Sequence, residues 1–375
     1  MRALSLGPQL ILSVDYIAAV FFMTLSTALL QKLSPNLAHQ AALSALKYNL
    51  VSQFQVKHDC LKTNIFGLNF SSPLGLSAGF DKDAQAISGI LKLGFAFVEA
   101  GTVTPDPQPG NPRPNLFRLT EDQALINWLG IPSQGLEVFA RRLELLPSNL
   151  PGVVGANIGA NTGSENIARD IAKCARRLAP LTQYLAVNVS CPNTPGLLEW
   201  QTPEGIRRIL AGTKEACANS SKIPAVLVKL SPDIGAEKLE TILQVLTEAE
   251  VDGLILSNTT TTRPTKLRSS RSNETGGLSG PPLASLSIKL LRLVREMTNG
   301  ALPIISSGGI ASAEDACARI MAGASLLQIY TSLVYQGPNL IRDITDGMAH
   351  CLVANGFSSV SELVGSEGKL AVRAT

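Results

Sequence analysis

The chain has 375 residues, of which 45% are hydrophobic and 16% charged, and its formal net charge is +3. This length allows one large domain or two ordinary ones, with ample material for a core. So small a charge gives no reason to expect a nucleic-acid partner. One basic cluster lies in a Pro/Ser/Thr-rich stretch that we interpret as a loop over a site; it comprises Arg263, Lys266, Arg268 and Arg271.

The cysteines and histidines argue against a metal centre. The six cysteines are far apart and show no CxxC spacing, and the three histidines are well separated. These spacings predict no metal or iron–sulfur ligands, no disulfide framework and no Ser-His-Asp triad. Instead of a metal or catalytic role, the histidines are interpreted as ordinary surface or core residues.

The amino terminus is apolar, and Asp15 is the only charged residue between Gly7 and Leu30. A spanning helix needs about 20 apolar residues, and a charge near the bilayer centre costs a few kcal/mol. We therefore expect a helix that lies on or dips into a membrane surface. A full span and a helix packed on the protein's own core are the alternatives. A secretory signal fits poorly, because Arg2 alone supplies its positive region and no small-residue cleavage site is obvious.

Past residue 66, short apolar runs alternate with turns rich in Gly, Asn, Ser or Pro and with helical stretches. Near-continuous apolar runs of this length are typical of strands buried on both faces of a parallel sheet. The eight runs are residues 73–79, 95–101, 153–159, 184–190, 225–231, 252–258, 303–309 and 325–331.

The segments between these runs carry helix signals. Residues 201–217 contain Thr202 as an N-cap, followed by proline at the first helical position. Residues 236–250 place leucine and isoleucine on one stripe, and residues 312–322 begin with Ser312 and two acidic residues. Eight strands alternating with helices over roughly 260 residues predict a (β/α)8 barrel of the α/β class. A doubly wound sheet is the alternative, but the first turn lacks G-x-G-x-x-G spacing.

Polar residues lie at or just past the ends of six of the runs, and active sites of such barrels form at that face. These residues, Lys82, Asn157, Asn188, Lys229, Asn258 and Thr331, predict one shared ligand site. The glycine- and hydroxyl-bearing turns at residues 306–310 and 329–333 match the phosphate sites of barrels, with ordinary tight turns as the alternative. Lys229, buried in an apolar strand, needs an anionic or electron-rich partner. Flavin mononucleotide (FMN) satisfies both demands.

Several long segments of the chain resemble dihydroorotate dehydrogenases, over about residues 35 to 355. They are residues 66–84, 101–114, 117–127, 186–197, 226–233, 256–264, 274–283 and 323–333. The chain most resembles the second class of the family, which is membrane-associated and passes electrons to quinone. The mark of that class is an N-terminal helical extension, and residues 33–39 resemble the start of its second helix.

The resemblance implies two sets of ligand contacts. FMN would be held by Ala78, Gly79, Gly101, Thr102, Asn157, Asn188, Lys229, Ser257, Gly280, Gly308, Gly309, Tyr330 and Thr331. Dihydroorotate would contact Lys82, Asn127, Gly130, Asn188, Asn193, Asn258 and Thr259. A small planar ring with a carboxylate calls for one cation and several amides, and this second set supplies both.

The reaction removes a proton from one ring carbon and a hydride from its neighbour, so a base must face the flavin across the substrate. The resemblance places this base at Cys191, where the quinone class normally has serine and the soluble class cysteine. A thiol, with a free pKa of about 8.5, is a far more competent base than a serine hydroxyl. An inert small residue is the alternative. The sequence also departs from the second-class pattern at residues 128–132, and at Ala160 and Thr162, where the family usually has lysines.

For electron exit we expect two amphipathic helices, residues 15–31 and 35–53, that form an apolar tunnel for membrane quinone. His39 and Arg118 would hydrogen-bond the quinone carbonyls; a cap or a surface contact is the alternative for each. Residues 1–55 would then form the membrane-associating extension and residues 56–375 the FMN-binding barrel. We expect a monomer that is peripheral on a bacterial or mitochondrial inner membrane and acts in pyrimidine (UMP) biosynthesis.

Three other functions stay open. The first is a soluble-type FMN barrel with a different electron acceptor. The second is the pyrimidine-reducing part of a larger dehydrogenase, although the chain lacks the cysteine clusters of its iron–sulfur modules. The third is a catalytically silent barrel that binds flavin or membrane.

Overall fold

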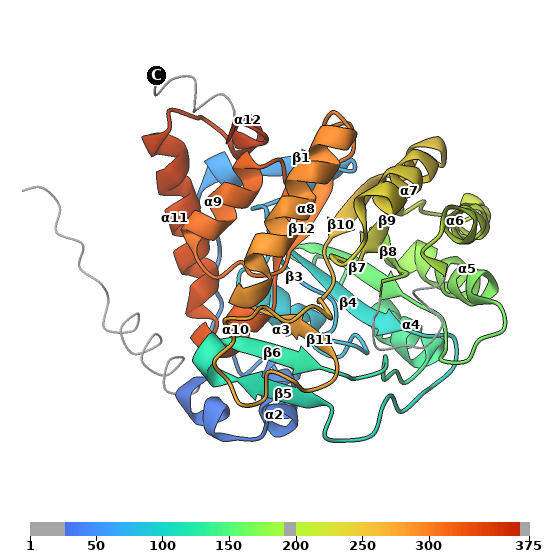
Figure 1. Ribbon diagram of the computed structural model, residues 1–375, viewed down its shortest axis with the longest axis horizontal. Helices are drawn as coiled ribbons and strands as arrows, with labels where there is room; N and C mark the ends of the chain where they lie inside the picture. Colours follow the sequence, from blue (N-terminus) through green and yellow to red (C-terminus); the bar gives the residue numbers. More distant parts are fainter. Residues whose placement is uncertain (1–26, 191–199, 368–375) are drawn as a thin grey trace, which may run out of the picture.

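The computed structural model describes residues 27–190 and 200–367, and its centre is a closed barrel of eight parallel strands (Figure 1). In chain order these strands are β3 (Leu74–Leu76), β4 (Phe97–Val103), β7 (Val153–Ile158), β8 (Tyr184–Asn188), β9 (Ala225–Leu230), β10 (Gly253–Leu256), β12 (Ile304–Ser307) and β13 (Leu326–Ile329). The ring closes where β13 pairs with β3. Each strand overlaps one of the eight apolar runs, so the predicted (β/α)8 barrel is confirmed.

Helices surround the barrel, and their apolar faces share one hydrophobic core with the strands. They are α3 (Ile87–Lys92), α4 (Leu136–Glu144), α5 (Ile167–Leu178), α6 (Pro203–Ala218), α7 (Ala236–Glu248), α8 (Ala284–Met297), α9 (Ala313–Met321), α10 (Thr331–Gln336), α11 (Asn339–Ala354) and α12 (Val360–Leu363), with 3-10 turns η1 (Asp59–Leu61), η2 (Thr120–Asp122), η3 (Ala179–Leu181) and η5 (Pro281–Leu283). Both predicted N-caps are confirmed: Thr202 Oγ1 and Ser312 Oγ accept backbone N–H groups of their first helical turns at 3.1 and 3.2 Å.

The barrel interior is apolar at the amino-terminal ends of the strands. Phe97 and Tyr184 fill it, and each ring occupies the space where a Cβ of Gly75 or Gly155 would lie. The antiparallel hairpin β1 (Thr63–Ile65) and β2 (Leu68–Phe70) closes this end, because the ring of its Phe70 packs 5.4 Å from that of Phe97. The ligand site is therefore confined to the opposite end.

A second sheet, which the sequence analysis did not predict, lies at that opposite end. It consists of β5 (Leu116–Leu119), β6 (Ala124–Asn127) and β11 (Gly277–Ser279), all antiparallel. In Figure 1 it lies beside α10 and α2 (Pro35–Lys47). The sheet brings residues 150 positions apart in the sequence to the mouth of the barrel.

The amino-terminal extension differs in part from the prediction. Residues 27–32 are helical, and the rest of the first expected helix lies outside the described residues. The expected second helix, residues 35–53, is too long, because α2 ends at Lys47. Asn49 takes the left-handed conformation (φ 56°) and Leu50 N–H donates to the carbonyl of Ala45 at 2.8 Å, which is how helices commonly terminate. Over the described ranges, the structure holds no helix with the length and hydropathy to cross a membrane.

Candidate active site

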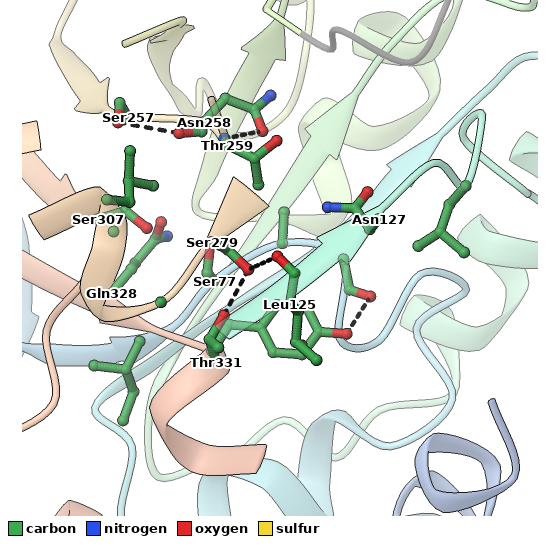
Figure 2. Close-up of a pocket in the computed structure, with 18 of the residues that line it drawn as sticks. Ser77, Leu125, Asn127, Ser257, Asn258, Thr259, Ser279, Ser307, Gln328 and Thr331 are labelled. Carbon is green, nitrogen blue, oxygen red and sulfur yellow. Dashed lines mark hydrogen bonds between the residues drawn. The ribbon is translucent and has the colours of Figure 1, made fainter. Parts of the chain in front are cut away.

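A cavity at the carboxyl ends of the barrel strands brings together most of the predicted site residues (Figure 2). From the expected substrate set it is lined by Lys82, Asn127, Gly130, Asn188, Asn258 and Thr259. From the expected cofactor set it is lined by Ala78, Gly79, Thr102, Asn188, Lys229, Ser257, Gly280, Gly308, Gly309, Tyr330 and Thr331. The residues predicted separately for two ligands thus share one cavity.

The remaining predicted residues lie elsewhere. Gly101 and Asn157 are directly behind the lining, since Gly101 accepts a hydrogen bond from Gly79 N–H and Asn157 one from the Thr102 hydroxyl. His39 and Arg118 are outside this cavity, and Cys191 and Asn193 fall outside the described residues.

Beneath the cavity lies a buried carboxylate that the sequence analysis missed. Glu99 is fully buried, and one of its oxygens is 3.6 Å from Lys229 Nζ. Asn157 Nδ2 and Gln328 Nε2 each donate to it at 2.7 Å. Sequence analysis expected a ligand to compensate the buried ammonium, but the protein supplies an anion of its own. The available signal was the carboxylate of Glu99 inside one predicted buried strand and the ammonium of Lys229 inside another.

A chain of hydrogen bonds, which we call the polar relay, runs from the cavity wall to Glu99. Asn258 donates to Ser190 Oγ (3.0 Å), Ser190 Oγ to Asn188 Oδ1 (3.2 Å) and Asn188 to Thr102 Oγ1 (3.0 Å). The Thr102 hydroxyl donates to Asn157 Oδ1 (2.5 Å), and Asn157 donates to Glu99.

Every hydrogen bond of the polar relay is donated in the same direction, from the Asn258 end toward Glu99. A carboxylate only accepts, so it fixes the Asn157 amide, and this amide in turn requires the Thr102 hydroxyl to donate. At the other end the backbone N–H groups of Ser190 and Thr259 donate to Asn188 Oδ1 and Asn258 Oδ1. The orientation of both cavity asparagines is therefore determined, and such aligned bonds strengthen one another.

The turn after β12, which we call the cradle, places Gly308 and Gly309 in the lining of the cavity. Gly308 and Gly309 have φ values of 99° and 77°. The Gly308 carbonyl is held from behind by Arg319 Nη2 and Ser287 Oγ, both at 2.8 Å, and Arg319 is itself buried. Burial lowers the pKa of Arg319 to about 10, so it remains a cation at neutral pH. Turns of this kind bind phosphate over the last strands of barrels.

We expect Gly309→Ala to damage this cradle. The alanine Cβ would lie 2.5 Å from Ala284 Cα, and the left-handed backbone adds strain, so stability should fall by roughly 2–5 kcal/mol. Gly163→Ala is the matched control, because its φ of 75° is nearly the same but nothing lies within 4 Å of the new Cβ. Thermal unfolding would be measured; equal effects of the two changes would contradict the prediction.

A second electrostatic feature is Lys82, whose Nζ donates to the Gly79 carbonyl at 2.6 Å. Burial lowers the pKa of Lys82 to about 8, although Asp83 and Asp81 oppose this effect. The ammonium is charged at neutral pH and poorly solvated, so an anionic ligand in the cavity would gain a strong interaction.

The second sheet supplies lining residues that sequence analysis also missed. The Thr331 hydroxyl donates to Ser279 Oγ (2.8 Å), and Ser279 donates to the Leu125 carbonyl (3.3 Å), as Figure 2 shows. Asn127 from the same sheet points into the cavity and donates to the Gly277 carbonyl at 3.3 Å. The sheet thus forms one wall of the site.

The extension reaches the site through aromatic contacts. The His39 ring is 5.2 Å from that of Phe80, which is 5.6 Å from the cavity residue Tyr330. Desolvation and the charge of Lys82 lower the pKa of His39 to about 3, so its imidazole is neutral at physiological pH. Arg118 Nη1 donates to the carbonyls of Gln31 (2.7 Å) and Leu33 (3.1 Å), which fastens the extension to β5.

These features define a class of protein: a (β/α)8 barrel with a glycine turn, a buried lysine and directed amides in one cavity at the carboxyl ends of its strands. The model of the dihydroorotate dehydrogenase family matches residues 60–352. The chain therefore belongs to the dihydroorotate dehydrogenase family.

Curated dihydroorotate dehydrogenases match nearly the whole chain. A dihydroorotate dehydrogenase (quinone) of Azorhizobium caulinodans is 44% identical over 340 residues, covering 89% of this chain and 96% of that one. The mitochondrial dihydroorotate dehydrogenase (quinone) of Mus musculus is 40% identical, covering 94% and 90%. A crystal structure of the Eimeria tenella enzyme with ferulenol superposes with a TM-score of 0.86 at 38% identity, over 88% of this chain and 95% of that one.

Proposed function

We propose that this protein binds FMN in the cavity, oxidises dihydroorotate to orotate there, and passes the electrons to a membrane quinone. Family membership gives the reaction, that of a quinone-dependent dihydroorotate dehydrogenase of pyrimidine biosynthesis. The observation that carries the proposal is the placement of the Lys82 ammonium and the oriented asparagines in the same cavity as the Gly308–Gly309 cradle. One end suits a carboxylate-bearing ring and the other a phosphate.

The residues present fit FMN. Among the described residues, Gln328 Oε1 and Ser332 Oγ are buried without a hydrogen-bond partner, and both residues line the cavity. A bound ligand with donor and acceptor groups would satisfy them. The cradle at Gly308 and Gly309 would hold the phosphate, and Lys229 would face the ring system. The flavin supplies the hydride acceptor of the reaction.

The substrate would be held by the amides and by Lys82. Asn188 Oδ1 accepts two hydrogen bonds from Ser190, and Asn188 Nδ2 donates one to Thr102, so the second N–H of Asn188 is what it offers to the cavity. Asn258 likewise keeps one N–H after donating to Ser190. Donors pointing inward suit the carboxylate and carbonyl oxygens of the ring, while Lys82 neutralises its charge. An analogue without these oxygens would leave buried donors unpaired.

The base of the reaction is proposed at Cys191. It follows Ser190, whose hydroxyl belongs to the polar relay, and the motif N-V-S-C-P-N-T places it beside Asn188 in the sequence. A thiolate there would take the proton from the ring carbon while the neighbouring carbon loses its hydride.

The proposed function is tested by anaerobic reduction of the bound flavin. The purified protein should be yellow, and dihydroorotate should bleach its absorption near the visible maximum within one turnover. Orotate alone should shift the spectrum without bleaching it. A flavin that stays oxidised in the presence of excess dihydroorotate would refute the reaction, and reoxidation faster by fumarate or NAD than by quinone would refute the acceptor.

We further propose that quinone reaches the flavin through the extension, with His39 and Arg118 near its carbonyls. Exposed leucines support a membrane contact there: Leu29, Leu33 and Leu37 have exposures of 56%, 42% and 56%. The protein would be a monomer, bound peripherally to a bacterial or mitochondrial inner membrane. The boundary between the extension and the barrel would lie near residue 55.

The triple change of Leu29, Leu33 and Leu37 to serine should weaken vesicle binding, because each buried leucine contributes roughly 1.5–3 kcal/mol. We expect reduction of a long-chain quinone in vesicles to fall at least about tenfold, while flavin bleaching and reduction of a short water-soluble quinone are unchanged. Leu145→Ser, at an exposed leucine on the barrel, is the control. Undiminished long-chain activity of the triple variant would rule out this surface as the membrane contact.

A further inference from the structure

We propose that Arg263 is a positioning residue for dihydroorotate, because it joins the two limbs of the loop that carries one wall of the substrate site. The loop, residues 257–276, connects β10 to β11 and contains the cavity residue Thr259. Arg263 itself does not line the cavity. The inference rests on the proposed function, since the ligand it positions is the proposed substrate.

The guanidinium donates to carbonyl groups of the returning limb with good geometry. Arg263 Nε donates to Ser272 O at 3.0 Å, and Nη2 donates to Glu274 O at 2.9 Å and to Gly276 O at 2.7 Å. These three acceptors lie at alternate positions in the residues that lead into β11. Bonds from a charged donor are about twice as strong as neutral ones, so this limb is firmly held.

The same side chain also binds the outgoing limb. Arg263 Nη1 donates to the carbonyls of Thr261 (3.2 Å) and Thr260 (3.3 Å). Asp233, on the loop after β9, accepts from Thr261 N–H (2.8 Å) and from the hydroxyls of Thr260 and Thr261. Burial lowers the pKa of Arg263 and the nearby Asp233 opposes that effect, which matches a cation enclosed by backbone oxygens.

The backbone that Arg263 holds, at Gly276 and the adjoining Gly277, packs against two residues proposed to contact the substrate, Asn127 and Thr259. Asn127 donates to the carbonyl of Gly277, the residue after the Arg263-bound Gly276. The backbone of Gly277 is so close to the Thr259 side chain that a Cβ there would overlap it, and a Cβ at Gly276 would overlap the Asn127 carbonyl. Displacement of the returning limb would therefore move both Asn127 and Thr259.

Among basic side chains, only a guanidinium has enough N–H donors to bind the carbonyls of both limbs at once. Its planar fork presents five N–H groups in fixed directions, whereas a lysine ammonium has three and is compact. Arg268 on the same loop gives a matched control, because its side chain is 72% exposed and its Nε is 3.7 Å from Asp122. Removing Arg268 takes the same charge from the same loop without opening it.

The test compares Arg263→Met, Arg263→Lys and Arg268→Met in the flavin-loaded protein. Orotate affinity would be measured by titrating the flavin absorption spectrum, and KM and kcat for dihydroorotate by steady-state kinetics. We expect both Arg263 variants to bind orotate at least about tenfold more weakly. Their KM should rise correspondingly with a smaller change in kcat, and Arg268→Met should stay within about twofold of the wild type.

A rescue experiment separates positioning from general stability. Arg263→Ala leaves a space lined by backbone oxygens that fits a guanidinium ion, so millimolar guanidinium should restore orotate affinity, and tetramethylammonium at the same concentration should not. Wild-type orotate affinity in both Arg263→Met and Arg263→Lys would overturn the proposal, even if their melting temperatures fall. If the wild type itself bound no orotate, the proposed function would fail instead, and the two results are distinguishable.

Discussion

Replacing Cys191 by alanine is expected to slow the reduction of the flavin by dihydroorotate by about 10²–10⁴-fold, the usual contribution of a general base. The substrate should still bind, because Lys82 and the asparagines remain. Stopped-flow absorbance under anaerobic conditions measures the reduction step alone, and orotate titration verifies binding. Near-normal reduction in the alanine variant would show that another group takes the proton.

Cys191→Ser is the matched variant, since it replaces the proposed thiol base with the serine that the resemblance to the quinone class implies at this position. A free thiol ionises near pH 8.5, far below a serine hydroxyl, so the rate of the wild type should level off at lower pH than that of the serine variant. Identical pH profiles would argue against a thiolate base.

Lys82 contributes a separate pH effect. Its pKa of about 8 means that the charged form which attracts a carboxylate is lost as the pH rises above 8. Orotate affinity should therefore decline above that pH in the wild type and in both Cys191 variants, whereas the maximal reduction rate should follow the base. Measuring affinity and rate separately keeps the two ionisations apart.

Sequence analysis identified the barrel because its strands and helices are each marked by patterns within a few neighbouring residues. Each strand is a continuous apolar run, and signals such as Thr202 and Ser312 mark helix starts within a few residues. The second sheet was missed because β11 has only three residues and pairs with β6 across 150 positions. The length of α2 was overestimated because the apolar pattern continues past Asn49, whose left-handed backbone ends the helix.

Sequence analysis named many of the residues that line the cavity, but not the hydrogen bonds that join them. Motif resemblance named the cavity residues, but it could not show that Asn258, Asn188 and Thr102 form one directed relay. That property depends on the spatial order of strand ends around the barrel. Likewise Arg319 and Arg263 donate to the carbonyls of Gly308 and Gly276, which are 11 and 13 positions away, and a sequence does not reveal which carbonyls a folded loop turns inward.

The second large effect is expected at Glu99. Glu99→Gln removes the charge that compensates Lys229 while preserving size, and breaking one side of a buried ion pair typically costs about 3–5 kcal/mol. We expect a loss of that order in denaturant unfolding with saturating flavin. Tyr184→Phe is the control, because it removes only a 3.4 Å hydrogen bond to Glu99 and should cost about 1 kcal/mol.

The double variant Glu99→Gln/Lys229→Met decides whether the ion pair is the cause. If the cost of Glu99→Gln comes from an unpaired ammonium, removing that ammonium as well should recover at least about 2 kcal/mol, because a buried pair replaced as a whole is often nearly neutral. Strictly additive losses would assign the effect to the bonds from Asn157 and Gln328 instead. In that case Glu99 would act on the site mainly through the polar relay, and Lys229 would depend on the bound ligand for its counter-charge.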